Sequence, residues 1–208
     1  ILVGKAIGDG LEVIGISDHG FTSKIKSLDY TTLLTYIEHL RRLQREKREI
    51  EVKIGLEIDV SKSTGLIPEG LPYEVLNKLD YVLFEHVEGV NNKEERDGRC
   101  LMSVVSARKK LDIPAGLAHT NLSDVFYREE ERAVNILAEN DMFVEINLRY
   151  IPDIRFAFTG NFPELFRKYN IKFAVGTDMH NDLNEVGNID SALRYIIEKG
   201  LRPHEMVA

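Results

Sequence analysis

The stretch FAVGTDMHN, residues 173–181, joins an apolar run to a carboxylate and an imidazole that stand two positions apart. The apolar run is typical of a buried strand, so Asp178 and His180 follow directly at its end. Such an ending is either a turn that happens to contain a histidine or one corner of a metal site. The residues at the ends of the other apolar runs decide between the turn and the metal site.

Short apolar runs alternate along the chain with longer segments of helical period. The runs, each an expected strand, are residues 13–16, 52–56, 81–84, 115–118, 142–146 and 171–175. Between the first two, leucine and isoleucine recur at helical spacing from Leu33 to Leu43. Helices are also expected at the start of the chain, from Asn161 and over residues 191–199. This alternation is typical of βα units that build a parallel sheet.

The composition favours one cytoplasmic domain over residues 1–208. Hydrophobic residues make up 43% and charged residues 29%, the balance of an ordinary globular protein. The formal net charge of -7 disfavours nucleic acid or an anionic membrane as a partner. The single Cys100 excludes an intramolecular disulfide and fits a reducing compartment. No apolar run approaches the roughly 18 residues of a membrane span, and no signal peptide opens the sequence.

Most of the expected strands end in a histidine or a carboxylate. These residues are Asp18 with His19, then Glu57, His86 and His119, and finally Asp178 with His180. In the 142–146 strand, alternation places Glu145 on the same face as Asn147. Because the carboxyl ends of parallel strands meet on one side of a sheet, these side chains are expected at one rim, where βα folds bind ligands.

Each of these residues alone has an ordinary structural explanation. Asp18 and His19 before a glycine are typical of a turn, and His86 or His119 could be a hydrogen-bonded core histidine. Together, however, several histidines and carboxylates at one rim would be a costly accumulation of buried polar groups unless cations satisfied them. Imidazole and carboxylate are ligands of zinc, manganese and iron. The sequence therefore predicts a cluster of divalent metal ions. The other two histidines, His39 and His204, are expected at the surface.

Five segments combine an apolar strand with a potential ligand at its end. They are GISDH at 15–19, GLEID at 55–59, DYVLFEH at 80–86, LAH at 117–119 and GTDMH at 176–180. In this combination the sequence resembles the PHP superfamily, the polymerase and histidinol phosphatase group of metal-dependent phosphoesterases, and in particular its histidinol-phosphatase-like branch. The resemblance extends over nearly the whole chain. Two neighbours depart from the family pattern: Glu85 before His86, and Thr120, where proline is common.

The resemblance implies an α/β fold, a distorted (β/α)7 TIM-like barrel, with two or three divalent zinc, manganese or iron ions. Carried over residue by residue, the implied metal ligands are His19, Glu57, His86, His119, Asp178 and His180. Glu57 would bridge two of the ions. Asp18 is the expected catalytic residue, which would orient His19 or stabilise the nucleophile.

The family also begins with a strand that carries a His-x-His motif, which this sequence lacks. Either the sequence begins after that strand, or the protein is a truncated and weakened member. The helix at Ile1 looks as if it were entered partway, and an open sheet edge would be a liability, so the first alternative is preferred. The polar segment 87–99 is the longest expected loop.

Such a metal centre supports hydrolysis of a phosphate ester by a metal-activated hydroxide. The expected substrate is a small phosphomonoester such as histidinol phosphate. Arg149 and Arg155 are expected to bind phosphate oxygens, with surface salt bridges as the alternative. The composition does not predict an oligomeric state.

Three other functions stay open at this point. One is an exonuclease or phosphodiesterase acting on nucleic-acid ends, which the net charge argues against. The second is an amidohydrolase-type barrel, in which Glu57 would stand where a modified lysine is usual. The third is a non-catalytic barrel that serves as a binding module, supported by the missing His-x-His motif and opposed by the retained ligands.

Overall fold

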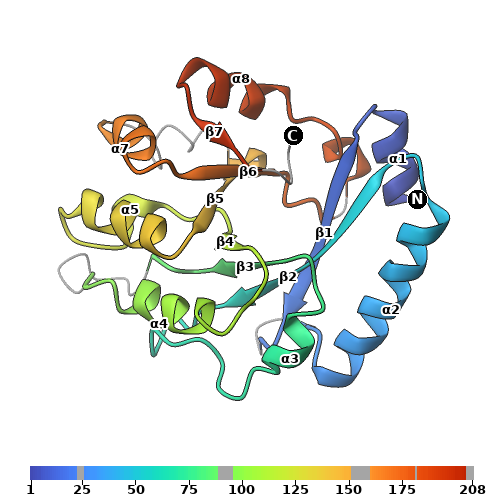
Figure 1. Ribbon diagram of the computed structural model, residues 1–208, viewed down its shortest axis with the longest axis horizontal. Coiled ribbons are helices and arrows are strands. Elements are labelled where there is room, and N and C mark those ends of the chain that lie inside the picture. Colours follow the sequence, from blue (N-terminus) through green and yellow to red (C-terminus); the bar gives the residue numbers. More distant parts are fainter. Residues whose placement is uncertain (23–25, 89–95, 151–159, 181, 205–208) are drawn as a thin grey trace.

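The computed structural model describes residues 1–22, 26–88, 96–150, 160–180 and 182–204. Its centre is a sheet of seven parallel strands that pair in chain order. The strands are β1 Val13–Gly20, β2 Glu51–Asp59, β3 Tyr81–Glu85, β4 Ala115–Leu117, β5 Met142–Asn147, β6 Lys172–Gly176 and β7 Arg202–Pro203. The sheet curls into a half-barrel with helices around its outer side (Figure 1). Within the described ranges, no pairing joins β7 to β1.

Helices connect most of the strands. They are α1 Leu2–Gly8, α2 Tyr30–Glu46, α3 Tyr73–Leu76, α4 Arg99–Arg108, α5 Glu130–Glu139, α7 Phe162–Lys168 and α8 Asp190–Glu198. Single 3-10 turns are η2 Leu122–Asp124, η3 Leu148–Tyr150 and η4 Leu183–Glu185. The six expected strands and the α/β class are confirmed. The seventh strand, β7, was not predicted, because it is two residues long and Pro203 reads as a helix stop. A strand before Ile1 stays a prediction.

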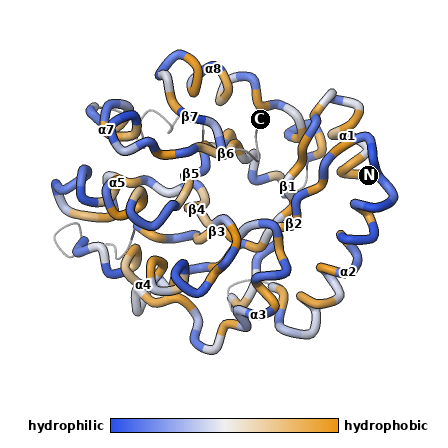
Figure 2. The backbone as a smooth tube through the Cα atoms, viewed as in Figure 1, coloured by the Kyte–Doolittle hydropathy of each residue, from blue (hydrophilic) through white to orange (hydrophobic). Residues whose placement is uncertain are grey.

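The two faces of the sheet carry different residues. In β2, Ile54, Leu56 and Ile58 face outward and pack with the apolar side of α2, in one large core. Figure 2 shows hydrophobic residues recurring among hydrophilic ones along this helix. The inner face has a smaller apolar cluster that includes Tyr81 and Phe143. Strict alternation along each strand therefore decides which side chains point into the half-barrel.

Glycines on the inner face make room for the two large aromatic rings. A Cβ on Gly55 would lie 2.2 Å from Cζ of Tyr81, and a Cβ on Gly116 would lie 2.4 Å from Cδ2 of Phe143. The rings fill the half-barrel below the carboxyl ends of the strands. The polar residues farther along the same face consequently stand above a packed apolar floor.

Side-chain packing, rather than strand pairing, brings the two edges of the half-barrel together. Val3 and Ala6 of α1 form a buried cluster with Val52 of β2 and Val186, which lies after β6. Met179 also packs against this cluster. The segment that follows β6 is thereby held beside the β1 edge.

The expectation that His204 lies at the surface was wrong, whereas His39 is exposed as predicted. His204 is 8% exposed, and its ring lies 4.7 Å from that of Phe143. The backbone N–H of His204 donates a hydrogen bond of 2.6 Å to the carbonyl of Phe173 in β6. This hydrogen bond continues the pairing with β6 by one residue past β7.

In the described ranges, no helix has the length and apolar character to cross a membrane. Much of the expected 87–99 loop, residues 89–95, lies outside the described residues.

Candidate metal centre

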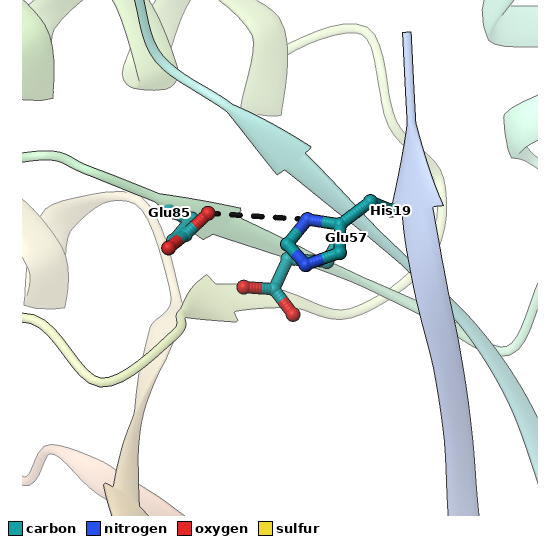
Figure 3. Close-up of side chains that lie close together, drawn as sticks. All are labelled: His19, Glu57 and Glu85. Carbon is teal, nitrogen blue, oxygen red and sulfur yellow. Dashed lines mark ion pairs between the residues drawn. The ribbon is translucent and has the colours of Figure 1, made fainter. Parts of the chain in front are cut away.

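Strand register brings the acidic and imidazole side chains of β1, β2 and β3 to one place. His19 of β1 is opposite Glu57 of β2, and Asp59 of β2 is opposite Glu85 of β3. Glu57 and Asp59 stand two residues apart and therefore point to the same face. Figure 3 shows His19, Glu57 and Glu85 turned toward one another from three neighbouring strands.

Two histidines from the loops after β3 and β4 complete this cluster. His86 Nε2 lies 3.1 Å from Glu85 Oε1. His119 Nε2 lies 3.4 Å from Glu57 Oε1 and 3.6 Å from Glu85 Oε1. On the other side, His19 Nδ1 is 3.4 Å from Asp59 Oδ1. We call these six residues, His19, Glu57, Asp59, Glu85, His86 and His119, the rim cluster.

The backbone is strained where it delivers several of the predicted ligands. His86, His119 and Asp178 have φ values of 63°, 28° and 48°, in the left-handed region that non-glycine residues seldom occupy. Each such residue costs about 1–3 kcal/mol and persists only where its surroundings hold it in place, and this type of strain gathers at functional sites. At His86, the left-handed turn lets two successive residues, Glu85 and His86, contact each other at the site.

Glu145 holds the backbone of His119 in position. Its Oε2 accepts hydrogen bonds from the His119 N–H at 2.9 Å and from Nδ2 of Asn147 at 3.2 Å. These contacts confirm that Glu145 and Asn147 share a face. Burial raises the pKa of Glu145 to about 7, against the influence of His119. Its Oε1 packs so tightly on Gly176 that a Cβ there would lie 1.7 Å away.

The rim cluster carries an excess of negative charge in a buried place. Burial first, and then Asp59 and Glu57, raise the pKa of Glu85 to about 8. Burial opposes protonation of His119, but the neighbouring glutamates, Glu57 foremost, raise its pKa to about 9. Asp59 likewise raises the pKa of His19, against burial. Without a cation, protons are therefore retained to offset the repulsion between carboxylates.

The residues of the rim cluster fit a divalent metal ion. Among the described residues, none hydrogen bonds to the buried atoms Glu57 Oε1 and His19 Nδ1. Two sets of three ligand atoms, one from His19, Glu57 and Glu85 and one from Asp59, Glu85 and His86, each lie within 4.8 Å of one another. Imidazole nitrogen with carboxylate oxygen is a donor set for zinc, manganese or iron.

Asp178 and His180 form a second group after β6, together with Arg149 from η3. Nη1 of Arg149 donates to the Asp178 carbonyl at 3.1 Å and to its Oδ2 at 3.3 Å. His180 Nδ1 lies 2.8 Å from Nη1 of Arg149 and 2.8 Å from the Asp178 carbonyl. Because arginine only donates and a carbonyl only accepts, the tautomer of His180 decides which of these two contacts is a hydrogen bond.

The structure thus brings His19, Glu57, His86 and His119 together and groups Asp178 with His180; their roles as ligands stay predictions. Asp18 is paired with Leu56, a residue of the outer core, so it lies on the opposite face from His19, and its catalytic role stays a prediction. Arg155 lies outside the described residues.

Two members of the rim cluster, Asp59 and Glu85, had been assigned no role from the sequence. Both stand in the quoted segments 55–59 and 80–86. For Asp59, the signal was its spacing of two from Glu57 in one strand, which places both on one face.

Comparisons with known proteins give a likeness among solved structures. No protein-family model and no curated protein matches the chain. Among solved structures, the crystal structure of the "putative histidinol phosphatase hisK" from Listeria monocytogenes superposes with a TM-score of 0.59. The two chains are 14% identical, and the match covers 92% of each. At this identity, the likeness shows that the fold is shared.

Proposed function

We propose that this protein is a metal-dependent hydrolase of phosphate esters that acts on a small phosphomonoester with two or three divalent ions. The observation that carries this proposal is the rim cluster, in which Glu57 Oε1 and His19 Nδ1 are buried without a hydrogen bond from the described residues. Buried polar atoms in this state call for a partner. A divalent cation at the carboxyl ends of the strands is a partner that both atoms would bind.

The chain's own residues would hold the ions and orient the substrate. When bound, divalent cations supply positive charge that favours attack of water on phosphorus and neutralises the phosphate oxygens. Glu145 fixes the backbone of His119, and Asn147 in turn fixes Glu145. The imidazole of His119 is consequently aimed at the rim cluster before any ligand arrives, which lowers the cost of binding.

Arg149 is the residue that we propose for gripping a phosphate oxygen. Its side chain is 44% exposed. Within the part of the chain that the structure describes, only its Nη1 donates from the guanidinium to protein acceptors, in the contacts with Asp178 and His180. Nε and Nη2 are thus available, and a guanidinium matches phosphate geometry with two parallel hydrogen bonds. Arg155 is proposed for the same role from the sequence alone.

Three observations support a small phosphomonoester as substrate. The net charge of -7 disfavours a long polyanion. The motifs resemble the histidinol-phosphatase-like branch of the PHP superfamily. The Listeria protein, whose fold is shared, is described as a "putative histidinol phosphatase".

A phosphatase assay on metal-loaded protein tests the proposal. The protein is stripped with a chelator, reloaded with manganese, zinc or iron, and incubated with p-nitrophenyl phosphate and with histidinol phosphate. A phosphodiester and single-stranded DNA serve as competing substrates. We expect metal-dependent release of inorganic phosphate from a monoester. The control variant is Glu51→Gln, at an exposed position of the same strand as Glu57, which should keep full activity. Loaded protein that releases phosphate from no monoester would refute the proposal.

A further inference from the structure

Glu85 occupies the middle of the rim cluster. It is the last residue of β3, it is 8% exposed, and strand register places it opposite Asp59. The inner face of β3 carries Tyr81 and Leu83 below it. A carboxylate at this depth is costly unless something of opposite charge is bound to it.

The two oxygens of Glu85 face different histidines. Oε1 lies 3.1 Å from His86 Nε2 and 3.6 Å from His119 Nε2. Oε2 lies 3.9 Å from His19 Nδ1, on the other side of the carboxylate, along the dashed line in Figure 3. The two sets of candidate ligand atoms in the described residues have one member in common, and it is Glu85.

We propose that Glu85 is a bridging carboxylate of the metal centre. One ion binds to Glu85 together with His19 and Glu57. The neighbouring ion binds to Glu85 together with Asp59 and His86. This inference rests on the proposed metal-dependent function, and it assigns to Glu85 a role that the family resemblance does not contain.

An independent observation points to a ligand at the same place. Glu57 is 8% exposed, and its Oε1 is buried and accepts no hydrogen bond from the described residues, although Glu57 is turned toward the space beside His19 (Figure 3) and its Oε1 lies 3.4 Å from Nε2 of His119. Two carboxylates that converge on this space from adjacent strands are arranged to hold two cations a few ångströms apart.

The bridge also accounts for the charge of the centre. The three carboxylates of Glu57, Asp59 and Glu85 balance most, and not all, of the positive charge of two divalent ions. The positive charge that remains attracts an anionic substrate. With two carboxylates and one imidazole in each set, the ligands are rich in oxygen, which suits manganese better than an all-imidazole set would.

Electron paramagnetic resonance of manganese-loaded protein tests the bridge, beside the metal content per chain. In the unsubstituted protein, we expect at least two ions per chain and the spectrum of an exchange-coupled pair. In Glu85→Gln, which keeps the shape and removes the charge, we expect the loss of at least one ion and the six-line spectrum of isolated manganese. The matched control, Glu51→Gln, should keep the coupled spectrum.

The outcomes separate the bridge from the function. An unsubstituted protein with two coupled ions, and a Glu85→Gln variant with the same two, would overturn the bridge and leave the hydrolase standing. Two uncoupled ions in the unsubstituted protein would also overturn it. An unsubstituted protein that binds no metal would overturn the proposed function and the bridge with it. If Glu85→Gln fails to fold, Asp59→Asn is measured in its place. The bridge predicts that Asp59→Asn loses the spectrum of the exchange-coupled pair, and an unchanged coupled spectrum in this variant would overturn the bridge.

Discussion

A single carboxylate, Glu145, links three strands at the base of the candidate metal centre. It accepts a hydrogen bond from the backbone of His119, after β4, and from Asn147 in its own strand. Its other oxygen lies against Gly176 at the end of β6. A glycine is needed there because Glu145 fills the space that a side chain would occupy. The identity of one small residue thus decides whether a histidine of the rim cluster is correctly aimed.

Gly176→Ala is therefore expected to be strongly destabilising. Its Cβ would lie 1.7 Å from Glu145 Oε1, and displacement of Glu145 would release the His119 backbone. We expect a loss of about 2 kcal/mol or more in the free energy of unfolding, in the range of overpacked cores, measured by urea denaturation. Gly4→Ala is the control, because Gly4 is an exposed residue of α1 and a Cβ there would have nothing within 4 Å. It should be neutral or stabilising by up to about 1 kcal/mol. Equal stability of the two variants would contradict the packing described for Glu145.

The raised pKa of Glu85 predicts how the metal-free protein responds to pH. The pKa of this carboxyl is about 8 in the folded state, against an ordinary value of 4.5. The folded state therefore favours the protonated form of Glu85. The stability that this form contributes is fully present below pH 4.5 and is lost as the pH rises through about 8. His119, with a pKa raised to about 9, acts in the same direction. The melting temperature of chelator-treated protein should fall from about pH 5 to about pH 9.

Glu85→Gln should make this fall shallower, because glutamine stays neutral at every pH. The control is Glu131→Gln at an exposed position, where Lys168 lowers the carboxyl pKa, so its titration is complete below this window. Parallel melting curves against pH for Glu85→Gln and the unsubstituted protein would show that Glu85 is not the titrating group.

Arg149→Lys tests the proposed contact with the phosphate. Lysine keeps the charge but cannot make two parallel hydrogen bonds, so we expect kcat/KM for a phosphomonoester to fall about tenfold to a hundredfold, chiefly through a higher KM. Arg132→Lys, in an exposed ion pair with Glu129, is the matched control and should leave both constants unchanged. An unchanged KM in Arg149→Lys would place the substrate elsewhere.

At this scale, the sequence predicts which positions end a strand better than it predicts which side chains meet. Asp18 and His19 are neighbours, yet alternation turns only His19 inward. Glu85 and His86 are also neighbours, and both reach the cluster because the backbone of His86 turns into the left-handed region. Neither the strand register nor that turn can be read from the residues alone. For this reason the sequence predicts no role for Glu85, whereas the spacing of two between Glu57 and Asp59 does indicate that both lie on one face.

Among the elements, α2 is attached to the sheet by a polar network as well as by its apolar side. Asp80, just before β3, accepts a hydrogen bond of 2.8 Å from the backbone N–H of Ile54 in β2. It also accepts two hydrogen bonds of 2.9 Å from the guanidinium of Arg41 in α2. The carboxylate therefore sets the position of the helix relative to β2 and β3, which carry three carboxylates of the rim cluster.

Asp80→Asn is expected to weaken this attachment. Asparagine keeps one acceptor oxygen but loses the paired contact with Arg41, so we expect a loss of about 1–3 kcal/mol in the free energy of unfolding. For a chain of this size, that corresponds to a fall of about 3 °C in melting temperature per kcal/mol. Asp97→Asn is the control, since Asp97 pairs with Arg99 at the surface and should contribute little. A similar small change in both variants would show that the Asp80 network is not stabilising.

The longest helix was predictable from local sequence, and the shortest helix and strand were not. The 17 residues of α2 begin at a capping box formed by Asp29 and Thr32 and present a leucine-rich side, so local sequence determines them. In contrast, α3 has four residues and β7 has two. Such elements exist because of the tertiary structure around them, which local patterns do not contain.

In the molecule as a whole, seven parallel strands form a half-barrel whose edges are joined by packing of α1 against the segment after β6. The βα alternation was sufficient to predict the class of the fold, because a parallel sheet requires helical crossovers. It could not predict how far the sheet curls. The likeness to the Listeria protein, with a TM-score of 0.59, supports this architecture over 92% of the chain.

The central claim is that the rim cluster binds divalent metal ions through Glu57, and metal content per chain tests it most directly. Gently purified protein and its Glu57→Gln variant would be measured by inductively coupled plasma mass spectrometry, before and after incubation with manganese or zinc. We predict about two or three ions per chain in the unsubstituted protein, as in multinuclear hydrolytic sites. We also predict a clear loss of metal in Glu57→Gln, with the fold intact by circular dichroism. An unsubstituted protein that holds no metal after incubation, or a Glu57→Gln variant with the same metal content, would contradict the claim.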